Sequence, residues 1–241
     1  MTGLVAQVVV IAKSPVPGRV KTRLTPPFSP RQAAALATAA LADTLHAAAQ
    51  VPAVRHVVAL DGAAGPWLPP GFDVVGQRGR GLDERIAAAL QDTYAELRRP
   101  VVLIGMDTPQ VTAGLLESAI GPLVSGAADA VLGLADDGGF WLLGLRHPDP
   151  GLVVGVPMST ADTGAAQFDR LAGAGLRVRS MPRRIDVDTV DDALAVAAQA
   201  PHSRFAATLR EMWPGLPPAP PRGPYDLVTG EPDLSLGPAP G

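Results

Sequence analysis

Short apolar runs alternate with helix-length segments along most of this chain, and this alternation limits the folds open to it. Residues 5–12, 54–60 and 101–105 are brief aliphatic runs, typical of strands buried on both faces of a sheet. Residues 30–50 and 81–99, which lie between them, have the length and apolar spacing of helices. Strands that alternate with crossover helices predict a mostly parallel sheet covered by helices on both faces, a Rossmann-like α/β fold.

The rest of the chain continues this pattern. Ser29, with Pro30 and Gln32, has the residues of a capping box, and Thr112 can cap the next helix. We expect further strands at 72–75, 129–135, 140–145 and 176–181, and further helices at 112–124, 162–173, 189–199 and 202–213. Residues 1–213 are therefore predicted to form one domain, followed by a Pro/Gly-rich C-terminal tail over 214–241.

Composition excludes several classes of function. The 241 residues include 20 basic and 23 acidic ones, and a net charge of −3 gives no electrostatic case for nucleic-acid binding. There is no cysteine, which rules out disulfides, thiolate zinc sites and cysteine nucleophiles. No apolar run reaches the roughly 18 residues of a membrane span, and the N-terminus lacks the features of a secretory signal. We expect a cytoplasmic protein of undetermined oligomeric state.

The loop after the first strand is the strongest candidate for a ligand site, because open parallel sheets bind ligands beyond the carboxyl ends of their strands. This loop holds Lys13, Arg19, Lys21 and Arg23, and Gly18 permits a turn with positive φ. Converging cations and backbone N–H groups suit a polyphosphate. The loop has no Walker A pattern. The alternative is a solvated basic loop without a ligand.

Aspartates follow two other predicted strands. Asp107 stands just past the strand at 101–105, and one carboxylate with phosphate oxygens and waters is a usual arrangement for Mg²⁺. Asp186 and Asp188 alternate, so both side chains could reach one cation. The alternatives are an Asx-turn at Asp107 and helix capping by Asp188 or Thr189.

Two glycine-containing segments could let a ligand approach the backbone closely. Gly138 and Gly139 lie between two predicted strands, and residues 76–85 form a glycine-rich loop that opens a helix. Ordinary turns and loops are the alternative in both places. The four histidines show no metal-ligand spacing, and Ser159 lies in no nucleophile-elbow motif.

Taken in order, these segments resemble a bacterial glycosyltransferase-like family of the nucleotide-diphospho-sugar transferase superfamily. The loop at 12–24 resembles that family's pattern A-K-x-P-x-P-G-x-V-K-T-R-L. Further resemblances are G-x-D-x-P at 105–109, D-D-G-G-F-W-L-L-G-L at 136–145, V-P-x-S-T at 156–160 and D-x-D-T at 186–189. The resemblance covers residues 5 to about 200 and implies a GT-A-type three-layer sandwich. More distantly, the chain is similar to 2-phospholactate and molybdenum cofactor guanylyltransferases.

The resemblance also implies roles for individual residues. Asp107 and Asp188 would hold Mg²⁺ or Mn²⁺, and the catalytic residues would be Lys21, Arg23 and Asp107. The residues near the nucleotide would be Ala12, Lys13, Gly18, Arg19, Lys21, Arg23, Gln77 and Gly79. The residues on the acceptor side would be Asp137, Gly138, Gly139, Ser159 and Thr160.

Three functions remain open at this level. The first is a Mg²⁺-dependent nucleotidyltransferase that couples a nucleoside triphosphate to a small phosphorylated acceptor, favoured by the cluster of cations after the first strand. The second is a glycosyltransferase that uses a nucleotide-sugar, with Asp136 or Asp137 as a base. The third is a nucleotide-binding module without catalysis. Only the first two make the chain an enzyme, in both cases a transferase.

Overall fold

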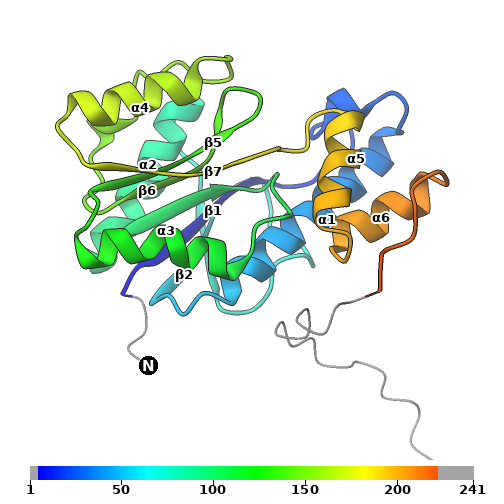
Figure 1. Cartoon of the computed structure of the whole chain (residues 1–241), viewed down its shortest axis with the longest axis horizontal. Coiled ribbons are helices and arrows are strands. Elements are labelled where there is room, and N and C mark those ends of the chain that lie inside the picture. Colours follow the sequence, from blue (N-terminus) through cyan, green and yellow to red (C-terminus); the bar gives the residue numbers. More distant parts are fainter. Residues whose placement is uncertain (1–4, 222–241) are drawn as a thin grey trace, which may run out of the picture.

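A computed structural model describes residues 5–221, which form a seven-stranded sheet between layers of helices (Figure 1). The strand order is β3-β2-β1-β4-β6-β5-β7. The strands are β1 (Gln7–Lys13), β2 (Arg55–Asp61), β3 (Phe72–Gly76), β4 (Val101–Gly105), β5 (Ala130–Ala135), β6 (Phe140–Leu145) and β7 (Val178–Arg184). The predicted α/β fold with a mostly parallel sheet is confirmed.

The helices lie between the strands as the alternation predicted, except for two that follow the last strand. They are α1 (Pro30–Ala49), α2 (Leu82–Leu97), α3 (Ala113–Ser125), α4 (Thr163–Gly173), α5 (Val190–Gln199) and α6 (Arg204–Met212), with short 3₁₀ turns η1 (Thr22–Leu24) and η2 (Pro150–Leu152). The capping box of Ser29 and Gln32 is present at the start of α1, and the Thr112 side chain accepts a hydrogen bond from the Leu115 N–H.

Strand β6 is the one strand of the described sheet that runs against its neighbours. It pairs antiparallel with both β4 and β5, whereas the other strand pairs are parallel. Only residues 136–139 separate β5 from β6, and so short a connection permits a hairpin but no crossover. Because only β6 is reversed, the carboxyl ends of β4 and β7 lie at the same end of the sheet as the carboxyl end of β1.

Three apolar clusters hold the layers together. Helices α1 and α3 pack on one face of the sheet, and α2 packs on the other with Leu171 of α4. A third cluster joins the outer side of α1 to α5 and α6. Helix α1 is therefore buried on two sides, which explains its alanine-rich sequence, because small side chains allow close approach from both. Figure 1 shows α5 and α6 beside α1, beyond the end of the sheet.

Two details differ from the sequence-based expectations. Strand β7 extends to Arg184 instead of ending at 181, because Pro182 lies in an edge strand, where a missing N–H is tolerated. The apolar spacing of residues 81–99 also predicts a buried Leu82 on the inner face of α2, but Leu82 is 43% exposed. Within residues 5–221, no helix combines the length and apolar character needed to cross a membrane.

The predicted tail begins against the folded part. Leu216 packs on the cluster around α6, and the Arg210 Nε donates to the Pro217 carbonyl (3.0 Å). Residues 222–241 of the predicted tail lie outside the described residues. The division at 213/214 stays a prediction.

Candidate functional site

A cavity of about 870 Å³ opens at the carboxyl ends of β1 and β4. Its walls come from the loop after β1, the loop between β3 and α2, the segment after β4, the β5–β6 turn, residues 158–163 and the segment after β7. This volume lies in the upper part of the range of about 300–1,000 Å³ typical of small-molecule sites. The cavity is therefore large enough for a nucleotide and a small second ligand.

Lys21 is the central cation of this cavity. Its Nζ lies 2.9 Å from the Asp107 Oδ2 and 3.1 Å from the Asp188 Oδ1, and its side chain is only 7% exposed. Buried Val20 and Leu24 anchor the loop on either side of it. Lys21 itself has a left-handed backbone (φ 47°), so the chain turns sharply to direct the side chain between the carboxylates.

The two carboxylates keep Lys21 charged despite its burial. Desolvation alone would lower the pKa of Lys21, but the charges of Asp107 and Asp188 and their hydrogen bonds outweigh it, and the pKa is raised above 10.5. The guanidinium of Arg23 lies 2.8 Å from the other oxygen of Asp188. Asp188 therefore holds two cations in the geometry described here.

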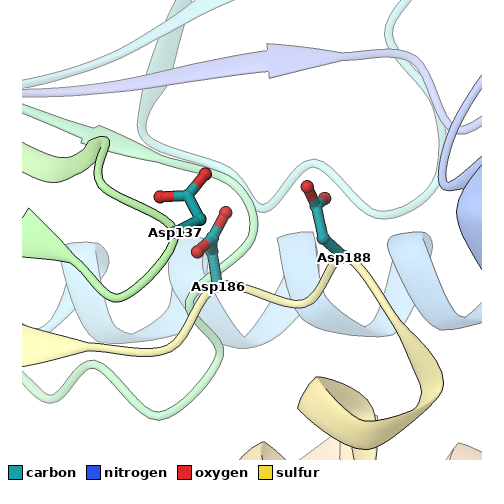
Figure 2. A group of neighbouring side chains, drawn as sticks. All are labelled: Asp137, Asp186 and Asp188. Atoms are coloured by element: carbon teal, nitrogen blue, oxygen red, sulfur yellow. The ribbon is translucent and has the colours of Figure 1, made fainter. Parts of the chain in front are cut away.

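Two further carboxylates, those of Asp137 and Asp186, form an acidic cluster with Asp188 beside this ion pair. Asp137, Asp186 and Asp188 each offer an oxygen, and these oxygens all lie within 4.8 Å of one another. In Figure 2 the Asp137 and Asp186 side chains lie next to each other, and Asp188 follows farther along the same segment. Burial, and then the negative charge of Asp137, raise the pKa of Asp186 to about 6. The cluster thus has unfavourable repulsion that a cation would relieve.

The loops after β4 and β7 are joined directly, which fixes the acidic side chains. The Val187 N–H donates to the Asp107 carbonyl (3.0 Å), and the Gln110 Nε2 donates to the Ile185 carbonyl (2.6 Å). A capping box of Thr189 and Asp192 starts α5 immediately afterwards. The alternative role of Thr189 as a helix cap is thus confirmed, while Asp188 still faces the cavity.

Other cations on the cavity wall differ in whether they already have a partner. Arg85 is paired with Asp61 (3.0 Å). Lys13, Arg19 and Arg80 line the cavity, and their side chains have no carboxylate partner or hydrogen bond within residues 5–221. These three side chains are free to meet an anionic ligand without first breaking an ion pair.

Gln77 ties two of the cavity walls together. Its Nε2 donates to the Ala12 carbonyl (2.8 Å) at the end of β1 and to the Ala59 carbonyl (2.9 Å) in β2. The loop between β3 and α2 is therefore held against the loop that carries Lys21. Gln77 and Ala12, both predicted near the nucleotide, line the cavity.

Three of the glycines predicted at the site determine the course of their loops and do not line the cavity. Gly18, Gly79 and Gly138 all have positive φ (76°, 126° and 93°) and are absent from the cavity wall. A Cβ on Gly138 would overlap the Ala161 carbonyl, so this glycine lets the β5–β6 turn pack on the segment before α4. These glycines are required by backbone geometry and close packing.

The other predicted site residues do meet in this cavity. The wall includes the predicted positions Ala12, Lys13, Arg19, Lys21, Arg23, Gln77, Asp107, Asp137, Gly139, Ser159, Thr160 and Asp188. The predicted pair of metal ligands is arranged differently from the expectation, because the Lys21 ammonium lies between Asp107 and Asp188. The sequence indicates Asp186 only through its alternation with Asp188, and no motif marks Arg80, which lies in the glycine-rich loop.

Comparison with known proteins identifies the family. Residues 35–160 match the model of a family described as "Uncharacterized protein conserved in bacteria (DUF2064)". The chain belongs to this family. No curated protein matches it.

Solved structures extend this result. A candidate nucleotide-diphospho-sugar transferase from Desulfovibrio desulfuricans G20 is 29% identical, with a TM-score of 0.78 over 86% of this chain and 94% of that one. CMP:2-keto-3-deoxy-manno-octonic acid synthetase, solved with CTP, is 14% identical (TM-score 0.50; 82% and 98% covered). Rv0371c from Mycobacterium tuberculosis H37Rv, solved with manganese, is 22% identical (TM-score 0.47; 81% and 98% covered).

These comparisons confirm the resemblance that the sequence motifs indicated. The Desulfovibrio desulfuricans structure supports a fold like that of nucleotide-diphospho-sugar transferases, and the synthetase supports the fold alone.

Proposed function

We propose that this protein is a metal-dependent nucleotidyltransferase, which joins a nucleoside triphosphate to a small phosphorylated acceptor. The observation that carries this proposal is the charge arrangement of the cavity, which is lined both by an acidic cluster and by Lys13 and Arg19, two cations without a carboxylate partner within residues 5–221. A triphosphate carries more negative charge than the diphosphate of a nucleotide-sugar, so an excess of available cations favours it. The acidic cluster would then supply oxygen ligands for a divalent ion.

The carboxylates fit a divalent cation with oxygen ligands. Asp137, Asp186 and Asp188 offer three oxygens close together, and the Asp107 Oδ1 is a buried atom without a hydrogen-bond partner within residues 5–221. Mg²⁺ and Mn²⁺ both accept such ligands. Asp188 would bind the ion with Asp186 and Asp137, or with Asp107 as the family resemblance implies. A bound ion would neutralise charge on the phosphates.

Lys13 and Arg19 would hold the outer phosphates, and Lys21 would contact the phosphate that reacts. An acceptor oxygen then attacks the α-phosphorus, the bond from that phosphorus to the bridging oxygen breaks, and pyrophosphate leaves. Such a transfer depends on positioning and on neutralising charge more than on a protein nucleophile. Lys21 is suited to this task because Asp107 and Asp188 hold its ammonium in one place.

Product analysis tests the proposal. The protein is incubated with Mg²⁺, each of ATP, GTP, CTP and UTP in turn, and a small-molecule fraction of bacterial extract as the source of acceptors. We expect pyrophosphate release with one triphosphate, and its loss in Lys21→Ala. Pyrophosphate release that is equal in Lys21→Ala and the wild type would contradict the mechanism, and no release with any triphosphate would contradict the activity.

Glycosyl transfer from a nucleotide-sugar is the second candidate function. It is favoured by the likeness to the Desulfovibrio desulfuricans protein, which is described as a candidate nucleotide-diphospho-sugar transferase. Asp137 lines the cavity and would be available as a base toward an acceptor hydroxyl. Incubation with nucleotide-sugars separates the two functions, because glycosyl transfer releases a nucleoside diphosphate and no pyrophosphate.

A further inference from the structure

We propose that Arg80 is a phosphate-binding residue of this site, which contacts the triphosphate of the nucleotide from the loop between β3 and α2. This inference rests on the proposed function and adds a residue that the sequence motifs do not mark. In this arrangement two loops contact the triphosphate, one carrying Lys13 and Arg19 and the other carrying Arg80.

The first argument is the distribution of ion pairs around the cavity. Neighbouring cations are already neutralised: Lys21 by Asp107 and Asp188, and Arg85 by Asp61. The Arg80 guanidinium has no such partner among residues 5–221, although it lines the cavity. An arginine whose five N–H donors are all available can bind a phosphate in bidentate fashion without giving up an existing bond.

The second argument is that the backbone around Arg80 is held in place. The Arg80 N–H donates to the Glu84 Oε2 (2.7 Å), so the Glu84 carboxylate is bound by the main chain of Arg80 and not by its guanidinium. Gly79 has φ 126°, and a Cβ there would lie 2.6 Å from the Glu84 Cβ. This tight turn fixes where the Arg80 side chain starts. A fixed starting point reduces the entropy lost when the side chain binds an anion.

The third argument concerns which anion Arg80 meets. Gln77 holds this loop against the Ala12 carbonyl at the end of β1, where the cationic loop begins. Arg80 therefore lines the cavity from a loop that is held beside the loop of Lys13 and Arg19, whereas Asp137 and Asp186 come from the β5–β6 turn and the segment after β7. The triphosphate would therefore bind between these two cationic loops, and the acceptor would bind near Asp137.

The chain supplies a matched control two residues away. Arg78 lies in the same loop, but its guanidinium is bound by Asp92, with Nε 2.9 Å from Oδ2 and a second contact to Oδ1. Arg78 does not line the cavity. Arg78→Ala and Arg80→Ala remove the same side chain and the same charge from one loop, so a difference between them reports on position and not on net charge.

The test is calorimetric titration of the full chain with ATP, GTP, CTP and UTP, each with Mg²⁺, and with inorganic tripolyphosphate. For the triphosphate that binds the wild type, we expect Arg80→Ala to raise Kd at least about tenfold, the scale of one charge-assisted hydrogen bond. Tripolyphosphate should weaken similarly, Arg80→Lys should recover part of the loss, and Arg78→Ala should match the wild type.

Other outcomes separate the inference from the proposed function. If the wild type binds a triphosphate and Arg80→Ala binds it equally well, Arg80 is not a phosphate ligand and the inference alone is overturned. If Arg80→Ala weakens the nucleotide but not tripolyphosphate, Arg80 contacts the base or sugar, which also overturns it. If the wild type binds none of these compounds, the proposed function fails and the inference fails with it.

Discussion

The ammonium of Lys21 occupies the space between two carboxylates that could otherwise hold a metal ion. It lies within 3.1 Å of both Asp107 and Asp188, and it is nearly inaccessible to solvent. A divalent cation that approaches Asp188 is therefore repelled by a fixed positive charge. Unit charges about 4 Å apart interact by about 4 kcal/mol at the effective dielectric constant near a protein surface. Lys21 should consequently control how tightly the site binds metal before any nucleotide arrives.

Replacing Lys21 by methionine tests this control. We expect Lys21→Met to bind Mn²⁺ at least about tenfold more tightly than the wild type in the absence of nucleotide, because the repulsion is removed. Electron paramagnetic resonance of free Mn²⁺ measures this affinity directly. Lys13→Met is the control, since Lys13 lines the cavity but has no carboxylate partner within residues 5–221. Unchanged or weaker binding in Lys21→Met would show that Lys21 does not compete with the metal.

Asp186 makes stability depend on pH in a defined direction. Burial, followed by repulsion from Asp137, raises its pKa from 3.8 to about 6, so the folded state holds this proton more tightly than the unfolded state. The contribution of Asp186 to stability is then full below about pH 4 and is lost as pH rises to about 6. Urea unfolding at several pH values should show this decrease in the wild type and a flatter profile in Asp186→Asn.

Asp129 should make stability depend on pH in the opposite direction, which provides a comparison with Asp186. Hydrogen bonds from Arg177 lower the pKa of Asp129 to about 2, so its contribution is full above pH 3.8 and is lost as pH falls toward 2. Asp129→Asn should therefore leave the slope between pH 4 and 6 as in the wild type. If Asp186→Asn also leaves that slope unchanged, the raised pKa of Asp186 is contradicted.

Local patterns predicted some of this site, and long-range contacts account for the rest. The alternation of Asp186 and Asp188 predicted that both would face one ligand, and the structure brings their oxygens together. The pairing of Lys21 with Asp188 joins residues 167 positions apart, and no spacing rule specifies such a contact. Sequence alone therefore predicted a cation loop and carboxylates but not that one neutralises the other.

At the scale of elements, one buried carboxylate attaches α6 to α1. Asp43 accepts hydrogen bonds from the Arg204 N–H (3.1 Å) and the Phe205 N–H (2.8 Å), and its side chain is only 8% exposed. Ser203 accepts from the Ala206 N–H. The first N–H groups of α6 are thus satisfied by two side chains, one of them from another helix.

Removing this carboxylate should loosen the third apolar cluster. We expect Asp43→Ala to lower the free energy of unfolding at pH 7 by about 2 kcal/mol, because two helix N–H groups lose their acceptor in a buried place. The gain from these hydrogen bonds is partly offset in the wild type, because burial disfavours the charged carboxylate and raises the pKa of Asp43. Chemical denaturation measures the difference.

Asp73→Ala is the matched control for Asp43→Ala. Asp73 pairs with Arg55 (2.7 Å) on an exposed edge of the sheet, and such surface pairs contribute at most about 1 kcal/mol. Equal losses in the two variants would contradict the role assigned to Asp43. A smaller loss in Asp73→Ala would show that helix attachment, and not aspartate removal as such, causes the effect.

The types of the elements could be predicted, because the spacing of apolar residues differs between helices and strands. The direction of one strand, β6, was not predicted. Residues 136–139 are too few for a crossover connection, so β6 runs antiparallel to β5. This direction follows from the length of the loop and not from the alternation of strands and helices. The end of β7 was missed because Pro182 indicates a strand end only in central strands. Both differences follow from position in the sheet, which local sequence does not contain.

At the scale of the whole molecule, the fold collects chemically different loops at one edge of the sheet. Cations come from the segments after β1 and β3, and carboxylates come from the segments after β4, β5 and β7. Strand order brings them together, since β1 and β4 are neighbours near the middle of the sheet. A ligand that bridges the two groups of loops should therefore stabilise the entire domain and not one loop alone.

Thermal unfolding with ligands tests this coupling. A ligand at about 100 times its Kd adds about 2.7 kcal/mol to the folded state, which corresponds to roughly 5–10 °C in Tm for a domain of this size. We expect one nucleoside triphosphate with Mg²⁺ to raise Tm by this amount, and each component alone to raise it less, because the cationic and acidic loops need both partners to be neutralised. A larger rise with a nucleotide-sugar would favour glycosyl transfer. Equal shifts with and without Mg²⁺ would contradict a shared role of the two groups of loops.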